Sequence, residues 1–361
     1  PQSNTQIIKI KGEKKMVNSS TMTLIVIVMA LYFVGMIAIS WMGRKYGKNF
    51  DDFISVGRNC TTLMIIGSAV GSHIGNGYVV GGAASGAAVG LSGAWYGIGC
   101  ALSYLAVALV LNHRVYKCGY ISLPEILNAR YGEKMTSVIF SVTTALSYIA
   151  NIAAQLMAGK ALFEALGFNG TLGVWVIAVV VMAYSCISGL WGACATSVVQ
   201  VAIIIVSLLA TFFIVLGRGA LGLVTEAVAN GLAPASYFDM GADGIAAILI
   251  TIVPISLASL CEQCTVQRIT SAKSEKTSFR ALILSVIIMI PCALMPAFIG
   301  MYGYVLFGDT TNSVFFKVAL DVLPSFFAAL LIAAVVAAIM STIDTMFVAF
   351  STIIMHNIYR G

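Results

Sequence analysis

The fold of this chain turns on IIGSAVGSHIGNGYVVGGAASGAAVG, residues 65–90. The segment is long enough to cross a bilayer and contains no Asp, Glu, Lys or Arg. His73 and Asn76 lie in its middle, and glycines occupy positions 67, 71, 75, 77, 81 and 82. Glycine is costly inside a helix, and polar side chains are costly in lipid. The segment therefore predicts a broken helix, whose unwound carbonyl and amide groups line a cavity.

Close helix packing is the alternative interpretation of the same glycines. Those at 67, 71 and 75 are spaced by four residues, as are those at 77 and 81. Small residues at this spacing let two membrane helices approach closely. Packing alone leaves His73 and Asn76 unexplained, whereas a break accounts for both.

The composition describes an all-α protein that crosses the membrane many times. Of 361 residues, 60% are hydrophobic and 9% are charged, against about 25% charged in a soluble domain. A helical span needs about 20 apolar residues, and we predict about nine such spans. They cover 21–42, 59–86, 89–112, 136–166, 172–190, 195–217, 244–268, 281–308 and 327–358.

Basic residues predict the orientation, because Lys and Arg in short loops stay in the cytoplasm. Arg44 and Lys45 follow the first predicted span, and Lys273 and Lys276 follow the seventh. Arg268, at the end of the seventh span, is counted with this second cluster. We therefore expect a protein of the cytoplasmic membrane, in which the odd-numbered spans end on the cytoplasmic side and the N-terminus lies outside.

Four lysines in the polar segment 1–20 oppose that orientation, because they precede the first span. We expect residues 1–15 to be a leader outside the true start at Met16, which restores the charge rule. Codons for Gly12 and Glu13 can spell a ribosome-binding sequence, which favours a bacterial source.

The last span, AAVVAAIMSTIDTMFVAFST (333–352), gathers hydroxyl groups in an apolar helix. Ser341 and Thr345 share a face, and hydroxyls in helices often bond only to their own backbone. Asp344 changes that interpretation, because a buried carboxylate needs a partner or a cation. Hydroxyls facing unwound carbonyls are oxygen ligands of the kind that hard cations favour.

Four stretches carry a family resemblance. AAIMSTIDT (337–345) resembles the signature of the sodium/solute symporter family, which moves small solutes such as sugars, proline, pantothenate and choline. Three further stretches resemble that family in order and spacing: GYISLPEILNARYG (119–132), SGLWGACATSVVQ (188–200) and EQCTVQRITSAKSEK (262–276). The resemblance covers about 20–360.

The resemblance implies a LeuT-type core of two inverted five-helix repeats, within a transporter domain over 21–361. One extra helix (21–42) precedes a first repeat (59–217) and a partial second repeat (244–358), with core helices 9 and 10 missing. It also implies a break near 71–77 and a sodium site between core helices 1 and 8. The implied ligands are backbone oxygens of Gly71, Ile74 and Ala338 and the hydroxyls of Ser341 and Thr342.

A substrate site is expected beside the break. The candidates lie on three helices, and for each a structural role as a contact between helices stays open. Two of the serines follow Pro254, which is a natural breaking point of its helix. The candidates are His73, Asn76, Tyr78, Tyr148, Asn151, Gln155, Ser256 and Ser259.

Ser197 departs from the family pattern, which has Asp at that position. Relatives use this Asp for a second sodium, so we predict one coupling cation per cycle, with Asp344 and Thr345 as possible coupling residues. The sequence thus predicts sodium-coupled symport of a small organic solute by alternating access, with sodium as the only metal and no nucleic-acid partner. It carries no sign of an enzyme.

Two alternatives remain open at this point. His73 can titrate near neutrality, so it or Asp344 would serve a proton-coupled carrier. A substrate sensor built on a transporter-like core is the second. The sequence predicts neither the solute nor the oligomeric state.

Overall fold

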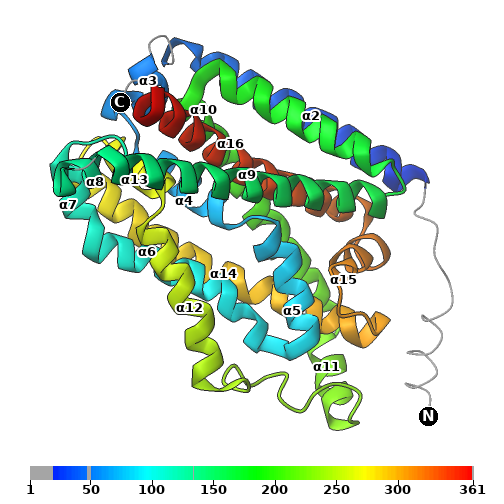
Figure 1. Ribbon diagram of the computed structural model, residues 1–361. Helices are drawn as coiled ribbons and strands as arrows, with labels where there is room; N and C mark the ends of the chain where they lie inside the picture. The colour runs from blue at the N-terminus through cyan, green and yellow to red at the C-terminus, as the bar shows by residue number, and fades with distance from the viewer. Residues whose placement is uncertain (1–18, 47–49, 133, 360–361) are drawn as a thin grey trace.

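A computed structural model describes residues 19–46, 50–132 and 134–359 (Figure 1). The expected leader at 1–15 lies outside these residues. In the described part, the named elements are all helices. In chain order the α-helices are α2 (Ser19–Gly43), α3 (Phe50–Ser55), α4 (Thr62–His73), α5 (Gly82–Val89), α6 (Trp95–Ala106), α7 (Asn112–Cys118), α8 (Leu123–Tyr131), α9 (Lys134–Ala165), α10 (Gly170–Gly217), α11 (Ala220–Ala229), α12 (Gly244–Leu260), α13 (Gln263–Thr270), α14 (Glu275–Phe307), α15 (Ser313–Lys317) and α16 (Ser325–Thr352). Short 3₁₀ or π turns join several of them: η1 (Arg44–Tyr46), η2 (Val56–Arg58), η3 (Gly77–Gly81), η4 (Gly90–Ala94), η5 (Val107–Leu111), η6 (Val318–Val322) and η7 (Ile353–Tyr359).

The predicted break of the first core helix is confirmed. Helix α4 ends at His73, and Ile74 leaves the helical region with φ −78° and ψ 59°. The chain then re-enters a helix through the π turn η3, which continues into α5. Gly75 follows Ile74 at this bend, and a residue without Cβ is easily accommodated in an unwound backbone.

A second break lies between α12 and α13, where the helix axis bends by 54°. The expectation that this helix breaks at Pro254 is wrong, because α12 continues through Pro254 to Leu260. A proline in a membrane helix removes only one backbone donor, which neighbouring groups can compensate. The break instead lies where Glu262 is extended, just before Gln263. The Gln263 side chain fixes that point by accepting from the Leu123 backbone N–H at 2.8 Å.

The spans at 172–190 and 195–217 form one 48-residue element, α10, which changes direction at Gly189 (φ 56°, ψ −139°). At 1.5 Å per residue this element is about 72 Å long, more than twice the hydrocarbon core. By length and composition, the described residues contain six helices that could cross a membrane, or seven if the bent pair counts as one. The predicted count of about nine differs because α10 joins two spans and α4 falls short of one; the count stays a prediction.

Helix α16 occupies the centre of the molecule. Figure 1 shows it running between α9 and the pair formed by α2 and α10, and it packs against all three and against α4. Of its most apolar window, 83% is buried inside the protein. The hydroxyls and Asp344 of this otherwise apolar helix are therefore kept away from lipid, where polar side chains are costly.

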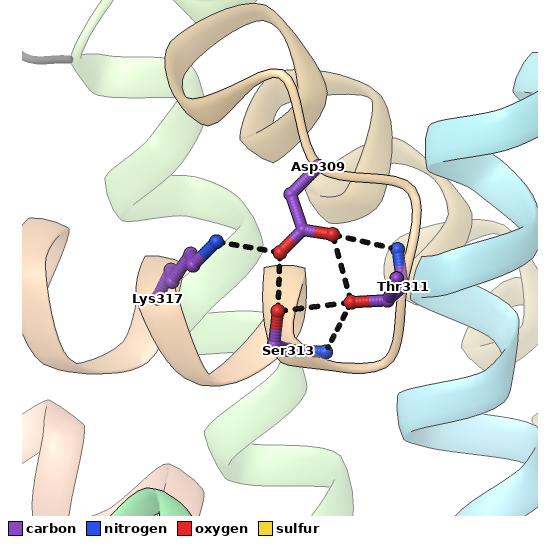
Figure 2. A network of polar contacts seen from close by, with 4 residues as sticks. All are labelled: Asp309, Thr311, Ser313 and Lys317. Carbon is purple, nitrogen blue, oxygen red and sulfur yellow. Dashed lines mark hydrogen bonds and ion pairs between the residues drawn. The ribbon is translucent and has the colours of Figure 1, made fainter.

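The loop after α14 is held by one carboxylate. Asp309 accepts hydrogen bonds from the Thr311 backbone and hydroxyl at 2.8 and 2.7 Å, bonds the Ser313 hydroxyl, and pairs with Lys317 at 2.6 Å (Figure 2). Partial burial raises the pKa of Asp309, but the Lys317 ammonium and these hydrogen bonds outweigh it and lower the pKa below its ordinary value. The network thus favours the charged carboxylate and ties α14 to α15.

Replacing this carboxylate should loosen the loop in a pH-dependent manner. Because the folded pKa of Asp309 is lowered, its contribution is complete above the unfolded value of about 3.9 and is lost as the pH falls through the folded value. We expect Asp309→Asn to reduce hydrogen-exchange protection over 308–317 by roughly three- to tenfold at pH 7, since each such bond contributes on the order of 1 kcal/mol. Mass spectrometry of exchanged peptides measures this.

The difference between the two proteins should shrink progressively below about pH 4. Asp243→Asn is the matched control, because Asp243 is exposed before α12 and makes no capping bond. Equal protection of Asp309→Asn and the unmodified chain at pH 7 would contradict the structural role of this network.

Candidate functional site

The end of α4 meets the middle of α16 through hydroxyl groups. The Ser341 hydroxyl donates to the Gly71 carbonyl at 2.7 Å, and the Thr342 hydroxyl lies 3.3 Å from the Ser72 carbonyl. Both hydroxyls also reach the carbonyl of Ala338, at 3.1 and 3.0 Å. Five oxygen atoms from two helices therefore converge on one point.

Two glycines make this approach possible. A Cβ at Gly71 would lie 3.2 Å from the Ser341 Cβ, and a Cβ at Gly75 would lie 2.9 Å from the Thr342 hydroxyl oxygen. A side chain at Gly71 would require a shift of a few tenths of an ångström, and one at Gly75 would displace the Thr342 hydroxyl. The glycines therefore serve both the break and the close packing, the two interpretations that the sequence left open.

The structure brings four of the five expected sodium ligands together. Oxygen atoms of Gly71, Ala338, Ser341 and Thr342 lie together, as just described. Ile74 is buried and starts the unwound segment, but no hydrogen bond of the described residues joins its carbonyl to α16. The Ser72 carbonyl lies beside Thr342 although the sequence did not single it out.

Asp344 forms a second polar cluster one turn along α16 from Ser341. Its carboxylate accepts from the hydroxyls of Tyr184 at 2.8 Å, Thr345 at 3.1 Å and Thr196 at 3.4 Å. The side chain is fully buried, and no Lys, Arg or His in the described ranges lies within ion-pair distance of it. Three donors thus satisfy a carboxylate that has no basic partner.

Ser197 lies between the two clusters. Its Cβ would be 3.5 Å from a Cβ placed on Gly71, and its hydroxyl oxygen is buried without a hydrogen-bond partner among the described residues. Buried hydroxyls in proteins are nearly always bonded. This oxygen is therefore an unused acceptor beside the point where α4 and α16 meet.

Four of the expected substrate residues lie together around the break. His73 Nε2 is 3.4 Å from the Ser259 hydroxyl, which comes from the end of α12. The backbone N–H of Asn76 donates to the side-chain oxygen of Gln155 on α9 at 3.4 Å. The two breaks and α9 thus share one polar region.

The other four expected substrate residues do not join this group. Tyr78 is buried against α14, where its hydroxyl donates to the Met289 carbonyl at 2.6 Å. Tyr148 is buried and accepts from the Cys264 backbone N–H at 3.2 Å, in the first turn of α13. Asn151 is exposed on α9 and Ser256 is half-buried on α12, and no hydrogen bond within the described residues ties either to the break.

Arg268 does not lie in a loop, contrary to the prediction from the charge pattern. It was counted among the cytoplasmic loop charges, but it lies within α13 and is only 1% exposed. Its guanidinium donates to Ser68 and Ser72 on α4 and to Tyr104 on α6, at 3.1, 2.7 and 3.0 Å. The charge rule cannot separate an arginine that follows a span from one inside a broken span, so charge counting gave no signal for this contact.

Comparisons with known proteins identify the family of this chain. The model of the sodium:solute symporter family matches residues 53–361. The sodium/proline symporter of Escherichia coli is 24% identical over 94% of this chain and 71% of its own length. Mouse sodium/glucose cotransporter 1 is 28% identical over 50% of this chain and 28% of its own length.

A solved structure shares the fold. It is described as a substrate-bound, outward-open Na⁺-coupled sialic acid symporter, and it matches 93% of this chain with a TM-score of 0.81 and 18% identity, over 73% of its own chain. This likeness confirms the predicted all-α LeuT-type architecture.

The two clusters predict different costs for losing a hydroxyl. Tyr184→Phe removes the shortest hydrogen bond to a buried carboxylate, so we expect it to destabilise the protein by about 1–3 kcal/mol. Ser197→Ala removes an oxygen without a partner, so its effect should stay within about 0.5 kcal/mol or be stabilising. Unfolding midpoints in sodium-free detergent solution measure both. A loss from Ser197→Ala as large as that from Tyr184→Phe would mean that Ser197 has a partner after all.

Proposed function

This chain belongs to the sodium:solute symporter family, and we propose on that premise that it carries a small organic solute across a membrane with sodium. The observation that carries the proposal is the contact between Ser341 on α16 and the Gly71 carbonyl at the end of α4. It brings oxygen ligands together at the helix break, next to the group formed by His73, Asn76, Gln155 and Ser259. No step makes or breaks a covalent bond.

In this proposal a sodium ion lies between α4 and α16, at the position to which the hydroxyl hydrogens of Ser341 and Thr342 now point. In the proposed site the ion is held by backbone oxygens of Gly71, Ile74 and Ala338 and by the hydroxyls of Ser341 and Thr342. The O–H groups that now donate to carbonyls would turn, so that the lone pairs of their oxygen atoms bind the ion. A hard monovalent cation suits a set of neutral oxygen atoms, and this set contains no carboxylate.

Coupling follows from the shared position of the two sites. Gly71 and His73 lie two residues apart at the end of α4, so an ion that fixes α4 against α16 also fixes the polar groups at the break. The effect is reciprocal, because a solute that favours the fixed arrangement raises the affinity for sodium by the same factor. Movement of the inner halves α4 and α13 relative to α16 would then give alternating access.

The proposed location and orientation of the protein rest on the pattern of charged residues in its loops. We place the protein in the cytoplasmic membrane, with the odd spans ending inside and the N-terminus outside. The similarity to sodium/proline symporters of Escherichia coli and Salmonella typhimurium supports a bacterial cell membrane.

Proton coupling is the second candidate, and Asp344 favours it. A fully buried carboxylate without a basic partner is a group that a proton can neutralise as well as a cation can. Under this candidate, uptake follows the pH gradient and does not need Ser341.

Uptake by the protein in liposomes separates the two candidates. We expect solute uptake driven by sodium, and we expect Ser341→Ala with Thr342→Ala to raise the half-saturating sodium concentration at least tenfold, which corresponds to about 1.4 kcal/mol of lost binding. Pools of amino acids and sugars, each tested with sodium, with lithium and with a proton gradient alone, make up the assay.

Ser351→Ala is the matched control for this experiment. Ser351 lies on the same helix and donates only to its own turn, at the Phe347 carbonyl, so sodium dependence should not change. Uptake that ignores sodium, follows pH and survives the double substitution would overturn the sodium site and move the mechanism to Asp344.

A further inference from the structure

Arg268 and Tyr104 form a buried pair behind the helix break. The guanidinium is 1% exposed and the tyrosine is fully buried. Arginine has only donors, so its 3.0 Å contact with Tyr104 makes the phenol oxygen an acceptor. Ser68 and Ser72 accept the other two bonds of this guanidinium. The pair therefore has a fixed direction of hydrogen bonding.

The hydrogen atoms around Tyr104 can be counted. Its oxygen lies 2.9 Å from the Ala69 carbonyl and 2.7 Å from His73 Nδ1. The Ser72 hydroxyl is farther away, at 3.4 Å from the phenol and 3.3 Å from Nδ1, and its own hydrogen points to the Ala69 carbonyl at 3.1 Å. The phenol has one hydrogen, and the carbonyl can only accept. If that hydrogen pointed to His73, the contact with Ala69 would hold two oxygen atoms with no hydrogen between them. All three short contacts of the phenol are satisfied only when Tyr104 donates to Ala69 and His73 Nδ1 donates to Tyr104.

This count fixes the other nitrogen of the ring as well. A neutral imidazole that carries its hydrogen on Nδ1 has an acceptor at Nε2. The Tyr104 oxygen that accepts from this ring also accepts from the Arg268 cation, so a second positive charge on the ring would lie beside the first in a buried site. Nε2 is 3.4 Å from the Ser259 hydroxyl, which is a long contact that a better donor can replace.

We propose that Arg268 and Tyr104 are positioning residues that hold His73 with Nε2 as a hydrogen-bond acceptor at the break, so that the transported solute presents a donor, an ammonium or hydroxyl group, to this atom. A carboxylate at the same point would face the ring lone pair and be rejected. This inference rests on the proposed function, because it assigns the polarity of the proposed substrate site.

Nitrogen NMR of the purified full chain tests the tautomer without any transport. The chain has three histidines, and replacing His113 and His356 by Gln leaves the two ring nitrogens of His73 as the imidazole signals of ¹⁵N-histidine-labelled protein. The expected spectrum shows a protonated, pyrrole-type Nδ1 and an unprotonated, pyridine-type Nε2. A ring protonated on Nε2, or on both nitrogens, overturns the proposal whatever the protein transports.

Tyr104→Phe in the same labelled chain should abolish the preference and give a mixture of tautomers. Tyr96→Phe is the matched control, because Tyr96 lies on the same helix, is 44% exposed and should leave the spectrum unchanged. Since a merely structural role would not alter the tautomer, an unchanged spectrum in Tyr104→Phe contradicts the positioning role. If Tyr104→Phe does not fold, the spectrum of the unmodified Tyr104 chain still decides the tautomer.

Thermal stabilisation of the purified protein in sodium tests the second part of the proposal, that the solute presents a hydrogen-bond donor. The probes are proline, glucose and their fully N- or O-methylated counterparts. Proline stabilisation alone would identify an ammonium donor, and glucose stabilisation alone a hydroxyl. We expect the methylated counterpart to bind at least tenfold more weakly than its parent. A counterpart that binds as well as its parent, or no stabilisation by either parent, overturns the donor assignment. Sodium-driven uptake is scored separately, so its absence would count against the proposed function and leave the tautomer result intact.

Discussion

The contact between the Ser341 hydroxyl and the Gly71 carbonyl is the constraint on which the rest of the arrangement depends. It brings α16 close to the end of α4, where glycine at 71 and 75 leaves room for the Ser341 and Thr342 side chains. It lies just before Ile74, where α4 ends and the chain unwinds. The break, the glycines and the buried hydroxyls are thus parts of one solution to placing polar atoms in the middle of a membrane protein.

A second set of polar contacts joins α4 and α13, one half of each of the two broken helices. Arg268 on α13 bonds two serines on α4 and the tyrosine on α6, so one cation holds three elements together. Such a buried cation is costly unless its donors find partners, and these three hydroxyl groups accept three of its five N–H bonds, one at each nitrogen. The same tyrosine bonds His73, so the structural contact and the proposed substrate site share an atom.

The sequence predicted correctly those features that depend on residues close together along the chain. The break near 71–77 follows from glycines flanking two polar residues in an apolar segment, and it is confirmed at Ile74. Reasoning failed where the cause lies elsewhere in the chain. Pro254 was expected to break its helix, but Gln263 sets the break through contacts with residues 121–123, more than 130 positions away. Tyr78 and Tyr148 were expected at the substrate site, yet their hydroxyls bond partners on α14 and α13, which no periodicity reveals.

The most direct test of this account is a pair of structures determined in sodium and in a sodium-free choline buffer, at a resolution that shows ions. The account predicts density for an ion between the Gly71 carbonyl and the Ser341 hydroxyl in sodium alone, with the two oxygen atoms no longer hydrogen-bonded to each other. An unchanged hydrogen bond in both buffers, with ion density at Asp344 or nowhere, would contradict it.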